Sequence, residues 1–346
     1  MQRKAHGLTR RSALAGAAAL SMPNFLRVAS AADAVDIAAA KKEGNVVLYT
    51  SAPIGAAQKV ANAFQEKYGI KVELFRSGGT EVLRRFMMEQ DARHVGADVL
   101  VTSDPAAAID LAAKDMFVPF RPADFDKVPA AFNDPAGLYV AQRVSLIAIY
   151  GRTDLFAPSE MPKTWDDLLN PKYKGKLVIT NPSFTSLQLG VVAMLSKLRG
   201  WDYYEKLNKN EVLVVAGNEQ AVNLVKSGER PIAAGADSQY ANEARLAGHP
   251  VQNFFPTDGT FGIPAVTAVV KSGKNPNAAK LLAEYTLSLE AQKLWPGNGI
   301  YAARIDVDPP AGSPAIGDVK VIPMDFGYIT GATGAVKKRF NEIFLS

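Results

Sequence analysis

The stretch NVVLYTSAPIGAAQKVANAFQEKYGIKVELFRSGGT, residues 45–80, decides the fold class. Its two ends carry short apolar runs that are typical of strands, and the segment between them has apolar residues at helical spacing. Val60, Ala61, Phe64 and Tyr68 share one face of that segment, and Gly69 follows it in the position of a helix C-cap. The stretch therefore predicts a strand, a helix and a second strand.

The same alternation continues on the C-terminal side. TEVLRRFMMEQDAR predicts a helix, ADVLVTSD a third strand and PAAAIDLAAKDM a third helix. Strands that are apolar throughout and alternate with helices indicate a parallel sheet with helices on both faces. A second α/β unit follows, and two long extended segments, residues 138–150 and 254–270, join it to the first. Two such crossings predict a hinge between two domains.

The first residues have the pattern of an export signal. Arg10 and Arg11 precede a short apolar run, and Ala29-Ser30-Ala31 gives small residues at a cleavage position. The adjacent arginines resemble a twin-arginine signal, although Ala13 stands where a phenylalanine is usual. We expect export to the periplasm and cleavage near Ala31.

Composition excludes several classes of function. The chain has no cysteine, so disulfides, thiol catalysis and thiolate metal sites are excluded. The formal charge of +5 falls to 0 without residues 1–31, because that segment holds five basic residues and no acid. A neutral chain is not expected to bind nucleic acid. Only His94 and His249 follow the signal, and no catalytic motif is present, so an enzyme is not expected.

Small polar residues follow the predicted strands at the points where helices begin. Ligands of open α/β sheets bind beyond the carboxyl ends of strands, and helix N-termini favour anions there. The surplus of hydroxyls between residues 180 and 186 exceeds what one helix cap needs. The predicted ligand-binding residues are Tyr49, Ser51, Ser77, Gly78, Gly79, Thr80, Ser103, Asp104, Asn181, Ser183, Thr185, Ser186, Asp237, Ser238 and Tyr240.

Each of these residues also has a structural interpretation. Ser77 or Thr80 would serve as an ordinary N-cap, Asp237 would cap the helix that follows it, and the two tyrosines would belong to the core. For Arg143 a surface ion pair is favoured over a ligand contact. The sequence leaves these alternatives open.

Several motifs together resemble the ferric-type solute-binding proteins of bacterial ABC importers, which belong to extracellular solute-binding protein family 1. The motifs are EGNVVLYTSAP, FQEKYGIKVELFRSGGTEVLRRF, GADVLVTSD, TWDDLLNPKYKGKLVITNPS and VVKSGKNPNAAKLLAEYTLSLEAQKLW. The resemblance implies a type II periplasmic binding protein fold with two α/β domains, two extended hinge crossings and a ligand cleft. It implies that the chain is divided into four parts: a signal (1–31), the first domain (32–140), the second domain (141–258), and a return to the first domain with the C-terminal helices (259–346).

The resemblance also implies a partner and a cargo. The partners are a small solute and a cognate ABC permease in the inner membrane, with no cofactor and a monomeric chain. The favoured solute is an organic anion, a phosphate ester or a phosphonate. Ferric members use two adjacent tyrosines, whereas this chain supplies Tyr240 alone, beside Asp237. Iron with a synergistic anion, held by Tyr240 and Asp237, therefore remains an alternative, as do a thiamine-type ligand and, remotely, an exported hydrolase.

Overall fold

The computed structural model describes residues 34–346 of the chain, so the predicted signal, residues 1–31, lies outside the described residues. Within this range no helix is long and apolar enough to cross a membrane. The strands are β1 (Asn45–Thr50), β2 (Lys71–Arg76), β3 (Val99–Thr102), β4 (Phe117–Val118), β5 (Val140–Arg152), β6 (Leu177–Thr180), β7 (Leu213–Val215), β8 (Ile232–Asp237), β9 (Val251–Phe254), β10 (Thr260–Val270), β11 (Tyr301–Ala302) and β12 (Val321–Ile322). The α-helices are α1 (Ile37–Glu43), α2 (Ile54–Tyr68), α3 (Gly79–Asp91), α4 (Pro105–Ala113), α5 (Ser186–Arg199), α6 (Asp202–Asn208), α7 (Asn218–Ser227), α8 (Ser238–Leu246), α9 (Pro276–Leu287), α10 (Leu289–Gln292) and α11 (Phe326–Phe344).

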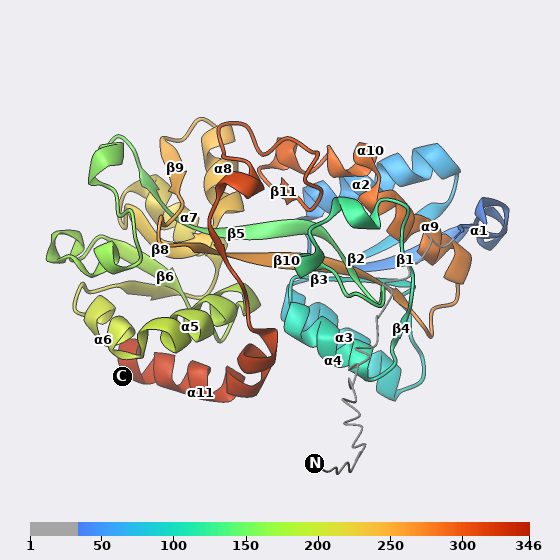
Figure 1. The fold of residues 1–346 in the computed structure, drawn as a ribbon, viewed down its shortest axis with the longest axis horizontal. Helices are drawn as coiled ribbons and strands as arrows, with labels where there is room; N and C mark the ends of the chain where they lie inside the picture. Colours follow the sequence, from blue (N-terminus) through green and yellow to red (C-terminus); the bar gives the residue numbers. More distant parts are fainter. Residues whose placement is uncertain (1–33) are drawn as a thin grey trace, which may run out of the picture. The chain divides into compact units, whose positions relative to one another are not determined.

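All strands join in one sheet, whose main order is β2-β1-β3-β10-β5-β8-β6-β7 (Figure 1). We call β2, β1 and β3 the first half of the sheet, and β8, β6 and β7 the second half. Within each half the neighbouring strands are parallel. This arrangement confirms the predicted fold class, because a parallel α/β unit stands at each end.

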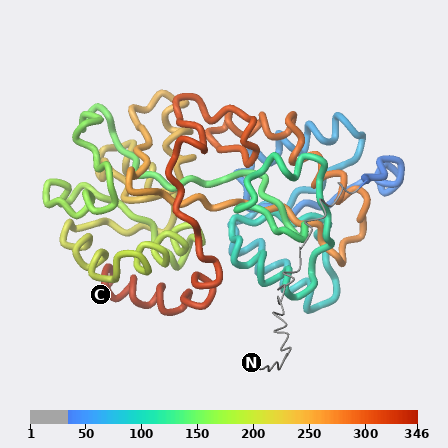
Figure 2. The backbone as a smooth tube through the Cα atoms, in the orientation of Figure 1, coloured from blue at the N-terminus to red at the C-terminus, as the bar shows by residue number. Residues whose placement is uncertain are grey.

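The two halves are joined by β5 and β10, which are the two predicted extended segments. They pair with each other in antiparallel fashion, from Gly262 opposite Leu146 to Thr267 opposite Val140. In the tube view they run side by side through the middle of the molecule (Figure 2). Every residue of β10, and all of β5 except its last residue, is buried. Burial of both faces explains why most residues of β5 and β10 are apolar.

Helices cover both faces of the first half, because side chains along a strand alternate between the two faces and both sets include buried apolar residues here. Leu48 of β1 packs with Phe64 of α2 and Leu282 of α9 on one face. Tyr49, the next residue, packs with Phe86 of α3 and Leu111 of α4 on the other face. Gly44 and Gly69 end α1 and α2 with φ values of 75° and 71°, a left-handed conformation that suits glycine.

The C-terminal helix α11 returns to the second half. Its Ile329, Val336 and Phe340 are buried in one hydrophobic cluster with residues of α5 and α6. The ribbon shows α11 lying beneath these helices (Figure 1). Helix α11 thus packs on the second half of the sheet. The predicted domain boundaries at residues 140 and 258 remain a prediction.

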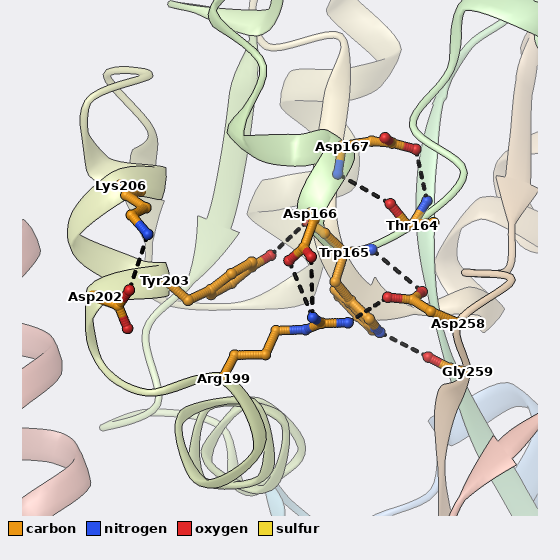
Figure 3. A network of polar contacts seen from close by, with 10 residues as sticks. All are labelled: Thr164, Trp165, Asp166, Asp167, Arg199, Asp202, Tyr203, Lys206, Asp258 and Gly259. Carbon is orange, nitrogen blue, oxygen red and sulfur yellow. Dashed lines mark hydrogen bonds and ion pairs between the residues drawn. The ribbon is translucent and has the colours of Figure 1, made fainter.

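The segment TWDDLLNPKYKG has a structural role that Figure 3 shows. It was expected to form a helix and a turn, and it forms two 3-10 turns, Asp166–Leu169 and Pro171–Tyr173. The buried Trp165 donates its indole N–H to Gly259 O at 2.7 Å and accepts from Tyr203 Oη at 2.9 Å, while Arg199 pairs with Asp166 and Asp258. The segment therefore holds α5 and α6 to the start of β10.

Candidate functional site

A cavity of about 300 Å³ lies between α3, α4, α5 and α11. Five of the predicted ligand-binding residues line it: Thr80, Asp104, Ser183, Thr185 and Ser186. The first two belong to the first half of the sheet and the other three to the second half. Helix α11 adds Thr330, Thr333 and Lys337 to the lining. The predicted strand ends of both halves therefore meet around one space.

The first wall of this site is the N-terminus of α3. Its N-cap is Gly78, and within residues 34–346 no side chain caps the helix, so Ser77 and Thr80 do not act as caps. The first N–H groups of a helix have no intrahelical partner, and here they also lack a capping oxygen. A Cβ placed on Gly79 would lie 3.8 Å from Ser51 Cβ and 4.0 Å from Ser186 Oγ. The two walls are therefore close together at this point.

The second wall is the loop that leads from β6 into α5. Thr185 caps α5 by accepting from Gln188 N at 3.2 Å, and Asn181 Oδ1 accepts from Ser183 N at 2.7 Å. These two side chains therefore stabilise the loop. The hydroxyls of Ser183 and Ser186 have no protein partner in the part of the chain that the structure describes, so they remain available to a ligand.

Between the walls, a set of polar contacts connects the two halves through β5. Ser51 Oγ and Ser103 Oγ lie 3.0 Å apart, and Arg143 donates an Nη2 hydrogen to Ser103 Oγ at 2.8 Å. On the same face of β5, Ser145 Oγ donates to Asp237 Oδ2 at 2.8 Å. Side chains from β1, β3, β5 and β8 thus meet beside the walls.

The charges in this set are buried. Arg143 is 4% exposed, and burial lowers its pKa to about 10, with the nearby Asp237 acting in the opposite direction. Asp237 is also 4% exposed, and burial raises the pKa of its carboxyl. No carboxylate of residues 34–346 lies within ion-pair distance of Arg143, so the ion-pair interpretation of this residue is wrong. Its location inside a long, mostly apolar extended segment was the signal for a buried role.

The residues after β8 lead directly into α8. Asp237 ends β8 and caps α8 directly, because its Oδ1 accepts from Gln239 N at 3.1 Å. Ser238 is 1% exposed. Tyr240 is partly buried and lines a separate cavity of about 260 Å³ with Glu219, Glu243 and His249. Burial raises the pKa of Tyr240 to about 12, with Asp237 adding to the rise, while Arg76 lowers it.

The structure does not bring Tyr49 to the cavity. Its side chain is 2% exposed in the core, and its hydroxyl donates to Glu89 Oε1 at 2.8 Å. Tyr49 is inside β1 and lies under α3, whereas Ser51 follows the last residue of that strand and contacts Ser103. The prediction that Tyr49 lies with the other candidates is therefore corrected to a core position.

Three residues of this region were not predicted as ligand contacts: Arg76, Arg143 and Ser145. Arg76 ends β2 and donates its Nε hydrogen to Ala52 O at 3.1 Å, and its charge is near enough to influence Arg143 and Tyr240. No sequence motif marks Ser145, because its role depends on the register between β5 and β8. Arginine at a strand end beside polar residues was a usable signal for Arg76.

The iron alternative, Tyr240 and Asp237 with a synergistic anion, stays a prediction. Among residues 34–346 no group of three or more His, Cys, Asp or Glu side chains is placed to hold a metal ion.

Comparison with known proteins now identifies the family. A profile for bacterial extracellular solute-binding proteins matches residues 96–330. The chain belongs to that family. It is 29% identical over 242 residues to a putative 2-aminoethylphosphonate-binding periplasmic protein of Salmonella typhimurium, a match that covers 67% of this chain and 68% of the relative.

Solved structures show the same fold. The periplasmic binding protein AfuA from Actinobacillus pleuropneumoniae, with exogenous fructose-6-phosphate bound, matches with a TM-score of 0.75 and 19% identity, over 88% of this chain and 99% of that one. Iron-bound HitA from Pseudomonas aeruginosa matches with a TM-score of 0.74 and 19% identity, over 86% of this chain and 99% of that one. This solute-binding protein therefore has the type II periplasmic binding fold.

Proposed function

We propose that this solute-binding protein captures a small organic anion, a phosphate ester or a phosphonate, between the two halves of its sheet and delivers it to an ABC permease. The observation that carries the proposal is the meeting of two helix N-termini, those of α3 and α5, across the Gly79–Ser186 approach. The relatives include a putative phosphonate-binding protein and a structure with a sugar phosphate bound, which supports this class of solute.

The electrostatics of the two walls favour an anion. Each helix N-terminus contributes about 0.3–1 kcal/mol of attraction to a negative charge, and up to about 2 kcal/mol where it is partly buried. The uncapped start of α3 offers free N–H groups, and Ser183 and Ser186 add hydroxyl donors from the other side. Arg76 donates to Ala52 O, next to Ser51, and so supplies a cation near the first wall. A phosphate-like group would therefore find donors on both walls.

The remaining features of the proposal follow from the family. We propose that the protein acts in the periplasm as a monomer and that it binds and releases its solute without chemical conversion. Binding between two walls would favour a closed arrangement of the halves, with β5 and β10 as the hinge. A smaller radius of gyration with ligand, measured by small-angle scattering, would support closure, and equal radii at saturation would contradict it.

The test of the solute class is a thermal shift assay on purified protein stripped of ligand. Inorganic phosphate, propylphosphonate and fructose 6-phosphate would be compared with ferric citrate and thiamine. A solute at 100 times its Kd should add about 2.7 kcal/mol to the free energy of unfolding. Stabilisation by one of the phosphorus anions is the expected result. A response to ferric ion or thiamine, with none to any anion, would overturn the proposal.

Single substitutions test the position of the site. Thr80→Ala removes a hydroxyl from the first wall and Ser183→Ala removes one from the second, so each should weaken binding about 5- to 10-fold, as the loss of one hydrogen bond does. Ser159→Ala is the matched control, because Ser159 is exposed in a 3-10 turn away from the cavity. Unchanged affinity in both wall variants would show that the solute binds elsewhere.

A further inference from the structure

Two polar atoms near Asp237, on Arg143 and on the adjacent Ser238, are buried without a partner. Arg143 Nη1 and Ser238 Oγ make no hydrogen bond within the described chain, and neither is exposed to solvent. Their residues are 4% and 1% exposed. A buried donor without a partner destabilises the folded state, most strongly when it is charged. A bound ligand is one group that can supply such a partner.

The surroundings of these atoms restrict what that partner is. The other Nη of Arg143 donates to Ser103 Oγ at 2.8 Å. Asp237 accepts from Ser145 Oγ at 2.8 Å and from Gln239 N at 3.1 Å, which leaves each carboxylate oxygen a further acceptor position. Arg143 and Asp237 influence each other but do not form an ion pair within residues 34–346. A donor and an acceptor thus lie close together, each incompletely satisfied.

These groups adjoin the anion site through a chain of direct contacts. Ser103 Oγ, which accepts from Arg143, lies 3.0 Å from Ser51 Oγ. Ser51 Cβ in turn lies 3.8 Å from the Cβ position of Gly79, where the two walls approach. One small molecule with its anion on the walls would therefore reach toward Arg143 with its other end.

Charge decides which group that end carries. An ammonium group would be attracted by Asp237 but repelled by the guanidinium groups of Arg143 and Arg76. A second anion would be attracted by Arg143 and Arg76 but repelled by Asp237. A hydroxyl can accept from Arg143 Nη1 and donate to Asp237 or Ser238, so it meets all three groups without a net charge.

We infer that the solute carries a hydroxyl opposite its anionic group, and that Arg143, Asp237 and Ser238 bind this hydroxyl and select for it. The inference rests on the proposed function, since the anion fixes the rest of the molecule. Because Arg143 Nη1 and Ser238 Oγ are closed to solvent, the solute enters while the halves are apart and is enclosed when they close. The substrate class is a hydroxylated phosphonate or phosphate ester.

Three probes of similar shape test the inference by isothermal titration: propylphosphonate, 2-hydroxyethylphosphonate and 2-aminoethylphosphonate, each extended by longer linkers to find the best length. At that length the hydroxyl compound should bind at least about 10-fold more tightly than the alkyl compound, as a hydrogen bond to a charged group contributes. It should also bind more tightly than the amine.

Substitutions assign the preference to Arg143. In Arg143→Met the hydroxyl advantage should fall below about 3-fold, because the charge-assisted hydrogen bond is lost. Arg304→Met is the matched control, since Arg304 is equally buried at 5% exposed but is paired with Asp124 and Asp306 away from the site. Its hydroxyl advantage should stay as in the unmodified protein. Ser238→Ala should also reduce the hydroxyl advantage, by a smaller factor, and this substitution adds no bulk to the site.

The outcomes separate the two proposals. If propylphosphonate binds but the hydroxyl adds nothing, or if the amine binds most tightly, the inference about the hydroxyl is wrong while the anion site stands. If no phosphonate or phosphate binds at all, the proposed function fails. An unchanged hydroxyl advantage in both Arg143→Met and Ser238→Ala would also overturn the inference.

Discussion

The protein contains two arginines that are almost equally buried but differently paired. Arg304, after β11, is 5% exposed; it donates to both oxygens of Asp306, pairs with Asp124 and donates to Leu287 O at 2.9 Å. Arg143, on β5, is 4% exposed, and within residues 34–346 its only hydrogen-bond acceptor is the hydroxyl of Ser103. The first has its counter-charges supplied by the fold. The second keeps donor capacity that the fold does not use, which is the difference between a structural and a binding arginine.

The largest expected effect is on the Arg304 side of this comparison. Arg304→Met leaves Asp124 and Asp306 without their cation, and we expect a loss of about 3 kcal/mol in the free energy of unfolding. This lies at the low end of the range for breaking buried pairs, because the two carboxylates are more than a third exposed. Urea denaturation measures the change. A loss below about 0.5 kcal/mol would show that Arg304 is not structural.

Arg143→Met should cost less stability, about 1–2 kcal/mol, since the substitution removes a charge that lacks full compensation but leaves Asp237 without its nearby cation. The double variant Arg143→Met, Asp237→Asn should recover most of that loss. Denaturation of the two variants side by side is the measurement. If Arg143→Met destabilises more than Arg304→Met, the contrast between the two arginines is wrong.

Ser103→Ala is expected to reduce stability by about 1 kcal/mol, as the loss of one hydrogen bond to a charged group does. It removes the hydroxyl that accepts from Arg143 Nη2 and that also contacts Ser51. We expect a loss of solute affinity in the same variant, because Arg143 becomes free to turn away from the site. A loss of stability without any change in solute affinity would contradict a role of Ser103 in positioning Arg143.

The smallest effect is a difference in pH dependence between two aspartates. Burial raises the pKa of Asp237, so the folded state holds its proton more tightly and the penalty for ionisation is relieved as the pH falls. The pKa of Asp306 is lowered by Arg304, so its stabilisation is present above the unfolded value and is lost as the pH falls through the folded value.

Asn substitutions make that difference measurable. Relative to the unmodified protein, Asp237→Asn should gain stability near neutral pH and lose this advantage in acid. Asp306→Asn should be less stable near neutral pH and approach the unmodified protein in acid. The measurement is the free energy of unfolding of both variants, relative to the unmodified protein, between about pH 3 and pH 7. This range includes the reference pKa of aspartate. Slopes of the same sign would contradict the assigned pKa directions.

Local features of the chain could be predicted because they depend on neighbouring residues. The strand and helix alternation from residue 45 onward, the glycine caps at Gly44 and Gly69, and the two extended crossings all follow from spacing and turn chemistry within short windows. The polar residues after the strands were found in the same way, and five of them line one cavity. The 3-10 turns after Trp165 were missed because a short polar helix pattern does not distinguish the two helix types.

Only the tertiary structure decided which side chains meet and which are buried. Arg143 contacts Ser103, 40 residues away, and Ser145 contacts Asp237, 92 residues away, because the registers of β5 with its neighbours bring them together. Tyr49, inside β1, belongs to the core, whereas Ser51, just beyond the end of the same strand, contacts Ser103. Sequence specifies local conformation through contacts between near neighbours, whereas the burial and pairing of a charge depend on groups that only folding brings close.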